Sequence, residues 1–487
     1  MNPPRSPAPT NRLLWFAVAA IAALRLATLG LYPLMDTTEA RYAEIARKLV
    51  ELGDWGALWF NYGEPFWGKP PLSFWMTGAG FKALGVSEFA ARFPHWLGGG
   101  LVAWLLWNWL ARRSLHEAIF ALALLCGSLG YFVAAGAVIT DMALVLGTTL
   151  AMRGFWLALH GAPTERRREQ YLFFLGAAAG LLAKGPVAAV LIGVPVAVWT
   201  LSCGESQRVL REISWGYGLL LTMALVVPWY SWAEWRTPGF LEYFLIGENW
   251  HRFSTPGWSG DLYGSAHAEP RGSIWLFAIA ACLPWSILMP ILAWRWKRVA
   301  NPVEAADRKL YGYLLLWGLF PCVIFSFAGN ILWTYVLPGV PALAMLTALW
   351  LARLPRSLPV ERLVAGGMAF TALVILLAVA VLRFGGLGDE KSARALVAAY
   401  YSHRSVGESL VFLGKRTFSA SFYSQGRAES VCCVDELRAR LDRGPVFVAI
   451  RDDDIDELPA TMMSQLRPVG RRGNYELFQS GPHAGGR

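Results

Sequence analysis

The chain of 487 residues has little charge and few cysteines. Asp, Glu, Lys and Arg make up only 16% of it, whereas ordinary soluble proteins carry roughly 25%. This scarcity argues against a cytosolic enzyme, and six cysteines do not form a disulfide framework. The hydrophobic share of 55% excludes a disordered chain. A polytopic membrane protein is the class that this composition favours.

Motifs for nucleotides, nucleic acids and disulfides are also missing. There is no Walker A loop, and no G-x-G-x-x-G opens a helix after a strand. The net charge of +10 lies mostly in short connections, so no nucleic-acid partner is expected. The acidic run 452–456 resembles the metal-binding cluster of nucleotide-sugar transferases, but its place after a strand predicts a solvated turn. The adjacent Cys432 and Cys433 are expected to be structural, because neighbouring cysteines rarely bridge each other.

Long apolar stretches recur along the first four fifths of the chain. A helix needs about 20 mostly apolar residues to cross a bilayer. About eleven stretches approach this length, and short or half-inserted segments would raise the number to twelve or thirteen. They lie near residues 13–34, 89–110, 115–133, 142–160, 171–183, 187–201, 214–232, 273–294, 310–328, 335–351 and 363–384. The sequence therefore predicts an all-α membrane bundle over residues 1–385.

Basic residues fall on alternate connections between these stretches, for example at 112–113, 166–168 and 208–211. By the positive-inside rule these connections and the N-terminus are cytoplasmic. An odd number of spans then places the end of the chain outside. The two long connections, 35–88 and 233–272, are outer ones, so the chemistry is expected at the outer face.

The tail, residues 386–487, changes to a polar composition that glycines interrupt. Residues 409–413, 445–450 and 474–478 are predicted strands, and 434–441 is a predicted helix. A small α/β domain at the outer surface fits this pattern.

The first outer connection begins with an amphipathic helix near residues 36–52. Asp36 and Glu39 have the spacing of a capping box. Either carboxylate is also a candidate base for an acceptor hydroxyl. Arg41 and Tyr42, in the same helix, are candidate substrate-binding residues.

Three further ionisable residues stand at the outer ends of apolar stretches. Lys69 is followed by Pro70-Pro71, and it is either an interfacial lysine or a cation for a phosphate. Asp141 starts a span, as a helix cap or as a catalytic carboxylate. Lys184 ends an outward-facing run, where an ionisable group is a functional candidate.

The second outer connection is rich in polar side chains. Candidate substrate or phosphate contacts are Glu248, His251, Arg252, His267 and Arg271. A divalent metal is possible in chemical terms but is not favoured, because the spacing matches no sharp metal pattern. After the next spans comes Tyr335, a candidate hydrogen-bond donor.

The order of these motifs resembles the lipid-linked-sugar glycosyltransferases of the aminoarabinose-transferase and protein O-mannosyltransferase superfamily, which have the GT-C fold. The resemblance covers about residues 13–350. The motifs are TEARYAEIARKLVELGDW, GKPPLSFW, ITDMAL, LLAKGPVA, ENWHRF and TYVLPGVPALAML. Such enzymes move a sugar from a polyprenyl phosphate to an acceptor at the outer face, and the aminoarabinose transferases end in a small periplasmic domain.

The resemblance implies roles for single residues. Lys69, Arg252 and Tyr335 would bind the donor phosphate, and Asp141 would match an acidic residue of the second outer loop. We expect Lys184 or Arg271 to lie near the same phosphate. Relatives carry an Asp-Glu pair where this chain has Thr38-Glu39, so Asp36 is a candidate to take that place.

The sequence thus predicts a glycosyltransferase in a bacterial inner membrane. It would use an undecaprenyl-phosphate sugar as donor and lipid A or another envelope glycan as acceptor, with the C-terminal domain in the periplasm. One alternative is transfer to a protein hydroxyl. Another, from a different class, is a transporter or flippase of lipid-linked sugars, which would bind the donor without cleaving it.

Overall fold

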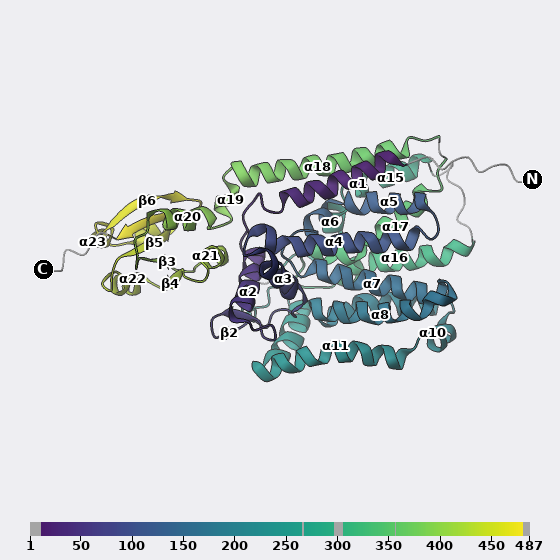
Figure 1. The fold of residues 1–487 in the computed structure, drawn as a ribbon, viewed down its shortest axis with the longest axis horizontal. Coiled ribbons are helices and arrows are strands. Elements are labelled where there is room, and N and C mark those ends of the chain that lie inside the picture. Colours follow the sequence, from purple (N-terminus) through teal and green to yellow (C-terminus); the bar gives the residue numbers. More distant parts are fainter. Residues whose placement is uncertain (1–10, 265–266, 297–304, 356, 481–487) are drawn as a thin grey trace, which may run out of the picture.

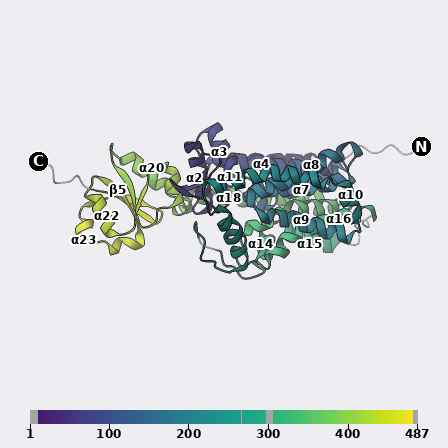
Figure 2. The ribbon, with the colours of Figure 1, turned by 90° about the horizontal axis from the view of Figure 1, so that it is seen from below.

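The computed structural model describes residues 11–264, 267–296, 305–355 and 357–480, without the side chains of 305 and 306. It consists of a long bundle of helices and a small α/β domain, which lies beyond one end of the bundle in both views (Figures 1 and 2). Helix α2 and the long connections lie between these two parts, whereas α1 starts at the far end of the bundle (Figure 1). We call the end that faces the α/β domain the near end and the opposite one the far end.

Apart from α10, the bundle helices coincide with the apolar stretches of the sequence, and each stretch contains one or two helices. They are α1 (Arg12–Thr28), α4 (Glu88–Leu110), α5 (Leu115–Cys126), α6 (Leu129–Ala134), α7 (Asp141–His160), α8 (Pro163–Lys184), α9 (Pro186–Ser202), α10 (Ser206–Glu212), α11 (Trp215–Arg236), α14 (Ser273–Ala281), α15 (Trp285–Trp296), α16 (Ala305–Phe325), η2 (Trp333–Gly339), α17 (Val340–Leu351) and α18 (Val360–Phe384). The predicted membrane bundle is confirmed.

Length and hydropathy single out a few of these helices. Among the described residues, α7, the segment Trp333–Leu351 and α18 are each long and apolar enough to cross a membrane. Two bent pairs, α10 with α11 at 66° and α14 with α15 at 83°, raise this number to five if each pair is one span. The other bundle helices are shorter, less apolar or more charged. The bend between α14 and α15 contains Pro284, which has no N–H to continue a helix.

Helices α7 and α8 approach each other backbone to backbone. A Cβ atom on Gly147 would lie 2.6 Å from the backbone nitrogen of Gly180, so only glycine allows this approach. The two helices are antiparallel and joined by a short turn at the far end (Figure 1). The first residue of α7, Asp141, and the last residue of α8, Lys184, therefore meet at the near end.

The connection 35–88 crosses the near end of the bundle. It contains α2 (Thr38–Leu52), the short hairpin β1 (Trp59–Asn61) and β2 (Glu64–Pro65), and α3 (Leu72–Leu84). The amphipathic helix is confirmed, but the capping box is wrong. The N-cap of α2 is Thr37, whose side chain makes no capping hydrogen bond. Both expected capping carboxylates have partners in other parts of the chain, described below.

The connection 233–272 is mostly irregular. It contains α12 (Phe240–Glu242), the π-helical segment η1 (Tyr243–His251) and α13 (Arg252–Ser254). Asn330 fixes its second half, because its amide donates to the carbonyl oxygens of Arg252 and Thr255 at 2.6 and 2.8 Å. Its side-chain oxygen accepts from the N–H of Gly257 at 3.0 Å.

The α/β domain is built on one five-stranded sheet of order β4-β3-β5-β7-β6, in which β4, β3 and β5 are parallel and β7 and β6 are antiparallel. Its elements are α19 (Leu387–Glu390), α20 (Arg394–His403), β3 (Ser409–Leu413), α21 (Phe418–Tyr423), β4 (Glu429–Val431), α22 (Val434–Leu441), β5 (Val446–Arg451), η3 (Asp452–Glu457), α23 (Ala460–Met463), β6 (Leu466–Arg472) and β7 (Tyr475–Ser480). The predicted strands match β3, β5 and β7, and the predicted helix matches α22. The boundary that we expect near residue 385 falls between α18 and α19, and it stays a prediction.

Candidate active site

Three adjoining cavities lie at the near end of the bundle. The apolar cavity, of about 80 Å³, is named for its walls of Leu144, Val187, Leu191, Phe244, Phe253, Phe325 and Pro338. Its other side is lined by Lys69, Lys184, Glu248, Asn249, Arg252, Asn330 and Tyr335. The central cavity, of about 160 Å³, is lined by polar residues of α2, α7 and η2. The outer chamber, of about 490 Å³, lies between the bundle and the α/β domain. Arg252 lines all three, so it marks the point where the three cavities meet.

The hairpin of α7 and α8 supplies the first charged pair of the site. The ammonium group of Lys184 donates to Asp141 Oδ1, and both side chains line the central cavity. The same ammonium nitrogen lies 4.5 Å from the ring centroid of Tyr335, which approaches from η2. Three residues that the sequence singled out are thus in contact.

Lys69 reaches the same cavities from the segment between β2 and α3. Its Nζ atom lies 2.8 Å from Glu248 Oε2 and 2.6 Å from the carbonyl oxygen of Gly68. The two prolines that follow restrict the backbone here, because each ring fixes φ. Lys69 is therefore held at the boundary between the apolar and central cavities, which it lines on both sides.

Glu248 and Arg252 lie one helical turn apart on η1 and α13. Arg252 Nη1 is 3.1 Å from each carboxylate oxygen of Glu248 and 3.2 Å from Asp261 Oδ2. Burial alone would raise the pKa of Glu248, but the charges of Lys69 and Arg252 outweigh it and hold this pKa below its usual range. Burial alone would lower the pKa of the Arg252 guanidinium group, but the charge of Glu248 outweighs burial and raises this pKa. Glu248 and Arg252 are therefore both charged at neutral pH.

Two guanidinium nitrogens in this cluster have no partner. Arg252 Nε and Arg41 Nε are both buried, and neither makes a hydrogen bond to any described residue. A buried donor without a partner costs about 1–3 kcal/mol. An anionic group bound in the cavities would supply acceptors for such donors.

The remaining residues of α2 and of the second connection complete the wall. Tyr42 is buried and lines the central cavity, and Arg41 and His267 line both the central cavity and the outer chamber. Arg41 donates to the carbonyl oxygen of Tyr263, and its guanidinium carbon lies 5.6 Å from the centre of the Phe418 ring. Burial lowers the pKa of His267, so this imidazole is neutral at pH 7.

Known proteins resemble this chain in both sequence and fold. Residues 11–244 match the family model described as dolichyl-phosphate-mannose-protein mannosyltransferase. The undecaprenyl phosphate-alpha-4-amino-4-deoxy-L-arabinose arabinosyl transferase 1 of Pseudomonas fluorescens (strain Pf0-1) is 32% identical over 348 residues, which are 67% of this chain and 57% of that protein. The corresponding transferase 2 of strain Pf-5 is 30% identical over 66% of this chain and 54% of its own length. The chain thus spans little more than half of these relatives.

The solved structure of ArnT from Cupriavidus metallidurans, bound to undecaprenyl phosphate, has the same fold. It is 20% identical, and the TM-score is 0.77 over 96% of this chain and 99% of that one. The chain belongs to the GT-C superfamily of membrane glycosyltransferases, within its aminoarabinose-transferase-like and protein O-mannosyltransferase-like branch. As a GT-C protein of this kind it is a multi-pass inner-membrane protein.

Asp36 of this GT-C protein lines the outer chamber together with Arg252 and Asp261, but it does not line the central cavity. Its carboxylate accepts from the Ser419 N–H at 2.9 Å and from the Ser419 hydroxyl. Burial raises the pKa of Asp36 above its ordinary value, although these hydrogen bonds oppose the shift. Asp36 therefore joins the first outer connection to the start of α21.

Glu39 points into the bundle, where it meets Arg92 of α4. The guanidinium group donates to both carboxylate oxygens, at 2.8 and 2.7 Å, and its other hydrogen bonds go to the carbonyl oxygens of Leu29, Tyr32 and Pro33. Burial would raise the pKa of Glu39, but the charge and hydrogen bonds of Arg92 lower it overall. Glu39 does not line any of the three cavities formed by the described residues.

Two sequence candidates lie apart from the others. His251 is exposed and its ring stacks on Trp258, 6.2 Å away between centroids. Arg271 is exposed just before α14. Neither residue lines the three cavities, as far as the described part of the chain shows.

Metal binding has no support in the arrangement of side chains. Among the residues that the structure describes, no group of three or more His, Cys, Asp or Glu could hold a metal ion. Carboxylates of the site are instead paired with Lys or Arg, as described for Glu248 and Asp141.

Sequence reasoning missed several residues that line the site. Asp261 and Tyr263 precede His267 in the second outer connection, and nothing in their spacing indicates a binding role. Lys415, Arg416 and Arg451 of the α/β domain line the outer chamber, and no local pattern shows that this domain contacts the bundle there. Arg92 carried a signal, because a charge inside an apolar stretch requires a partner.

Proposed function

We propose that the protein is a glycosyltransferase that moves a sugar from a polyprenyl phosphate, of the undecaprenyl type, to lipid A or another envelope glycan. The observation that carries this proposal is the partly buried cluster of Lys69, Lys184 and Arg252, which lines two cavities between the apolar side chains of one and the polar side chains of the other. A lipid with a phosphate at its head matches both sets of side chains. The names of the relatives support the same donor.

The donor phosphate would bind to Lys69 and Arg252, with the Tyr335 hydroxyl as a further donor. The first isoprenoid units would contact the apolar walls, for example Leu144 and Phe325. A phosphate oxygen would give Arg252 Nε the acceptor that it lacks in the described structure. It would also compete with Glu248 for Lys69. Before the donor arrives, the Glu248 carboxylate holds this lysine in position.

We assign the base to Asp141 and positioning to Asp36 and Glu39. An acceptor oxygen attacks the anomeric carbon, the bond from that carbon to the phosphate oxygen breaks, and its electron pair stays on the phosphate. The acceptor proton passes to the Asp141 carboxylate, which lines the central cavity together with Lys69. The leaving phosphate is a weak base, so it needs cations more than a proton.

The distribution of basic residues supports an orientation. At the far end, Arg112 and Arg113 follow α4 and Arg166 lies in the first turn of α8. They pair with Glu165, Asp307 and Glu212, respectively. By the positive-inside rule the far end, with the N-terminus, would be cytoplasmic. The cavities and the α/β domain would then face the periplasm.

Purified protein in lipid nanodiscs tests the proposal. It would receive undecaprenyl-phosphate aminoarabinose or a hexose analogue together with lipid A, and mass spectrometry would follow the release of undecaprenyl phosphate. We expect Lys69→Ala to reduce this release by at least about 100-fold, because a cation is lost where charge develops. Lys82→Ala is the matched control, since Lys82 is exposed at the end of α3 and lines none of the three cavities.

One outcome would count against a transferase, and another against its phosphate site. A donor that binds with undiminished affinity and stays intact with every sugar tested would indicate a transporter. Full activity of Lys69→Ala would show that the donor phosphate does not depend on Lys69. Sugar found on a protein instead of on lipid A would keep the reaction and change the acceptor.

A further inference from the structure

The sheet of the α/β domain has a switch point that opens toward the outer chamber. The chain leaves β3 to form β4 on one side of it, and then crosses to form β5 on the other side. In open α/β sheets, ligands bind outside the carboxyl ends of the strands at such a point. The crevice between the ends of β3 and β5 is therefore a candidate binding site.

This crevice forms one wall of the outer chamber. Leu413 and Arg451 are the last residues of β3 and β5, and both line the chamber. Lys415 and Arg416, which follow β3, line it as well. The opposite wall comes from the bundle, through Arg41 and the second outer connection. The chamber thus joins the switch point to the central cavity.

Basic residues outnumber acidic ones in the lining of this chamber, with Arg41, Arg252, Lys415, Arg416 and Arg451 against Asp36, Asp261 and Asp454. Asp36 is bound to Ser419 and Asp261 is paired with Arg252. In contrast, Arg41, Lys415 and Arg416 have no carboxylate within 4.0 Å among the described residues. Arg41 also has the buried Nε that lacks a partner. The chamber therefore has unused positive charge.

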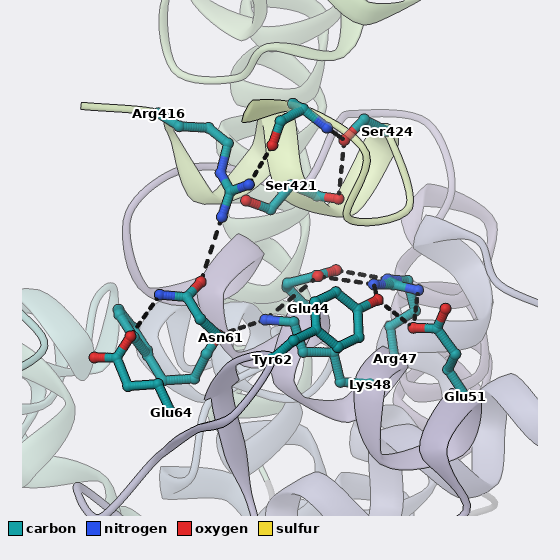
Figure 3. A network of polar contacts seen from close by, with 12 residues as sticks. Glu44, Arg47, Lys48, Glu51, Asn61, Tyr62, Glu64, Arg416, Ser421 and Ser424 are labelled. Atoms are coloured by element: carbon teal, nitrogen blue, oxygen red, sulfur yellow. Dashed lines mark hydrogen bonds and ion pairs between the residues drawn. The ribbon is translucent and has the colours of Figure 1, made fainter. Parts of the chain in front are cut away.

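Arg416 is fixed by neutral groups. Its guanidinium donates to the carbonyl oxygen of Ala428 and, at 3.3 Å, to the side-chain oxygen of Asn61 in the β1–β2 hairpin. Figure 3 shows this link above the ion-pair network of α2, in which Arg47 joins Glu44 and Glu51. The α/β domain is thus held against the bundle by side chains, and the cations of its crevice keep their place above the chamber.

The other lining groups suit a saccharide better than a peptide. The aromatic residues Tyr263, Phe418 and Tyr475 line the chamber. The apolar faces of such rings can stack on the apolar face of a sugar ring. Extended peptides instead add to an exposed sheet edge. The edge strands here, β4 and β6, contribute no lining residue to this chamber.

We propose that the α/β domain completes the acceptor site, and that Arg41, Lys415 and Arg416 bind a phosphate or carboxylate group of a saccharide acceptor in the outer chamber. This inference rests on the proposed transferase function and names the chemical class of its acceptor. With the anionic group held at the crevice, the nucleophilic oxygen of the acceptor would reach the central cavity past Arg252 and His267, which line both spaces.

Binding to the full-length protein in uncharged nanodiscs tests this site with soluble probes. The probes are a glucosamine disaccharide bisphosphate, the same disaccharide without phosphate, inorganic phosphate, and a phosphoserine peptide of equal charge. We expect the bisphosphate to bind at least about tenfold more tightly than each of the other three, because charged hydrogen bonds and ring contacts act together.

Charge reversal locates the site. Lys415 is exposed, so Lys415→Glu should fold, and we expect it to weaken binding of the bisphosphate by at least about tenfold. Lys415→Arg should retain binding to within about threefold, since the charge is kept. Arg443→Glu is the matched control, because Arg443 is exposed just before β5, at the opposite end of the sheet.

Each alternative outcome has a clear meaning. Equal affinity for the two disaccharides, tighter binding of the peptide, or an unaffected Lys415→Glu would overturn the acceptor site. Binding of undecaprenyl phosphate, measured on the same samples, reports on the donor site and should be unchanged in all three variants. A protein that binds the bisphosphate but not undecaprenyl phosphate would contradict the proposed function while leaving this anion site in place.

Discussion

The hairpin of α7 and α8 carries two buried ion pairs, one toward each end, and their surroundings differ. Toward the far end, Arg153 Nη1 lies 2.5 Å from Glu169 Oε2, with side chains that are 2% and 0% exposed. Both groups have further partners, because Arg153 donates to Asn108 at 2.7 Å and Glu169 accepts from Arg168 at 2.8 Å. This pair is closed by protein on all sides.

The pair at the near end is open. Lys184 and Asp141 are 11% and 8% exposed, and both line the central cavity. Besides Asp141, the ammonium group of Lys184 has the ring of Tyr335 against it. The same type of contact therefore does two things in one hairpin. Where it is enclosed it fixes the packing of the helices, and where it borders a cavity its charged groups line that cavity.

The largest expected effect is on activity, from the open pair. Asp141→Asn should lower kcat by about 10²–10⁴-fold, the usual contribution of a general base. Its melting temperature should change little, because the cavity lets water reach Lys184. The release of undecaprenyl phosphate and the thermal unfolding transition are the two measurements. Asp435→Asn, on exposed α22, is the control.

If Asp141→Asn lost as much stability as Glu169→Gln, the proposed contrast between the two ends would be wrong. Unchanged turnover of Asp141→Asn with full donor binding would move the base to another residue, and Asp36 would be tested next.

The closed pair should show the reverse behaviour. Glu169→Gln leaves the buried charge of Arg153 without its partner, which costs about 3–5 kcal/mol in comparable sites. We expect a markedly lower unfolding midpoint and normal turnover per folded molecule. Glu165→Gln is the matched control, since Glu165 is 33% exposed and its pair with Arg112 is worth about 1 kcal/mol or less. Equal melting of the two variants would show that the far-end pair contributes no more than a surface one.

The sequence predicted the near-end cluster well, and physical reasons explain why. Lys69, Asp141 and Lys184 stand at the ends of apolar stretches, where a charge is costly and therefore informative. Hydropathy locates these ends to within a few residues, so the topology brings the charges together. The strands β3, β5 and β7 were found for a similar reason, because each is a short apolar run between turn residues.

Contacts between distant segments were beyond the sequence. The spacing of Asp36 and Glu39 suggested a local cap, yet each carboxylate binds a group far along the chain, Ser419 and Arg92 respectively. Local rules for capping count only neighbouring residues, so tertiary partners can override them. The exposed strands β4 and β6 were missed because β6 lacks an apolar run and β4 has only three residues.

The start of α2 repeats the contrast between closed and open carboxylates on a smaller scale. Glu39 is enclosed with Arg92, which lowers its pKa, whereas Asp36 borders the outer chamber and burial raises its pKa. A carboxyl whose folded-state pKa is depressed adds stability at neutral pH that is lost as the pH falls through that value. For a raised pKa the sign is opposite, and charged Asp36 therefore carries a penalty above its folded-state pKa.

The smallest expected effect follows from this sign. Asp36→Asn should be as stable as the unmodified protein at pH 7, or more stable by no more than about 1 kcal/mol, because it removes a buried charge and retains an acceptor for the Ser419 N–H. As the pH falls toward 4, Asp36 takes up its proton and the two proteins should converge. Thermal unfolding in detergent at pH 7 and pH 4 measures this difference. A variant that is less stable at pH 7, with a gap that closes in acid, would show that Asp36 is stabilised as an anion, and it would then belong with the enclosed carboxylates.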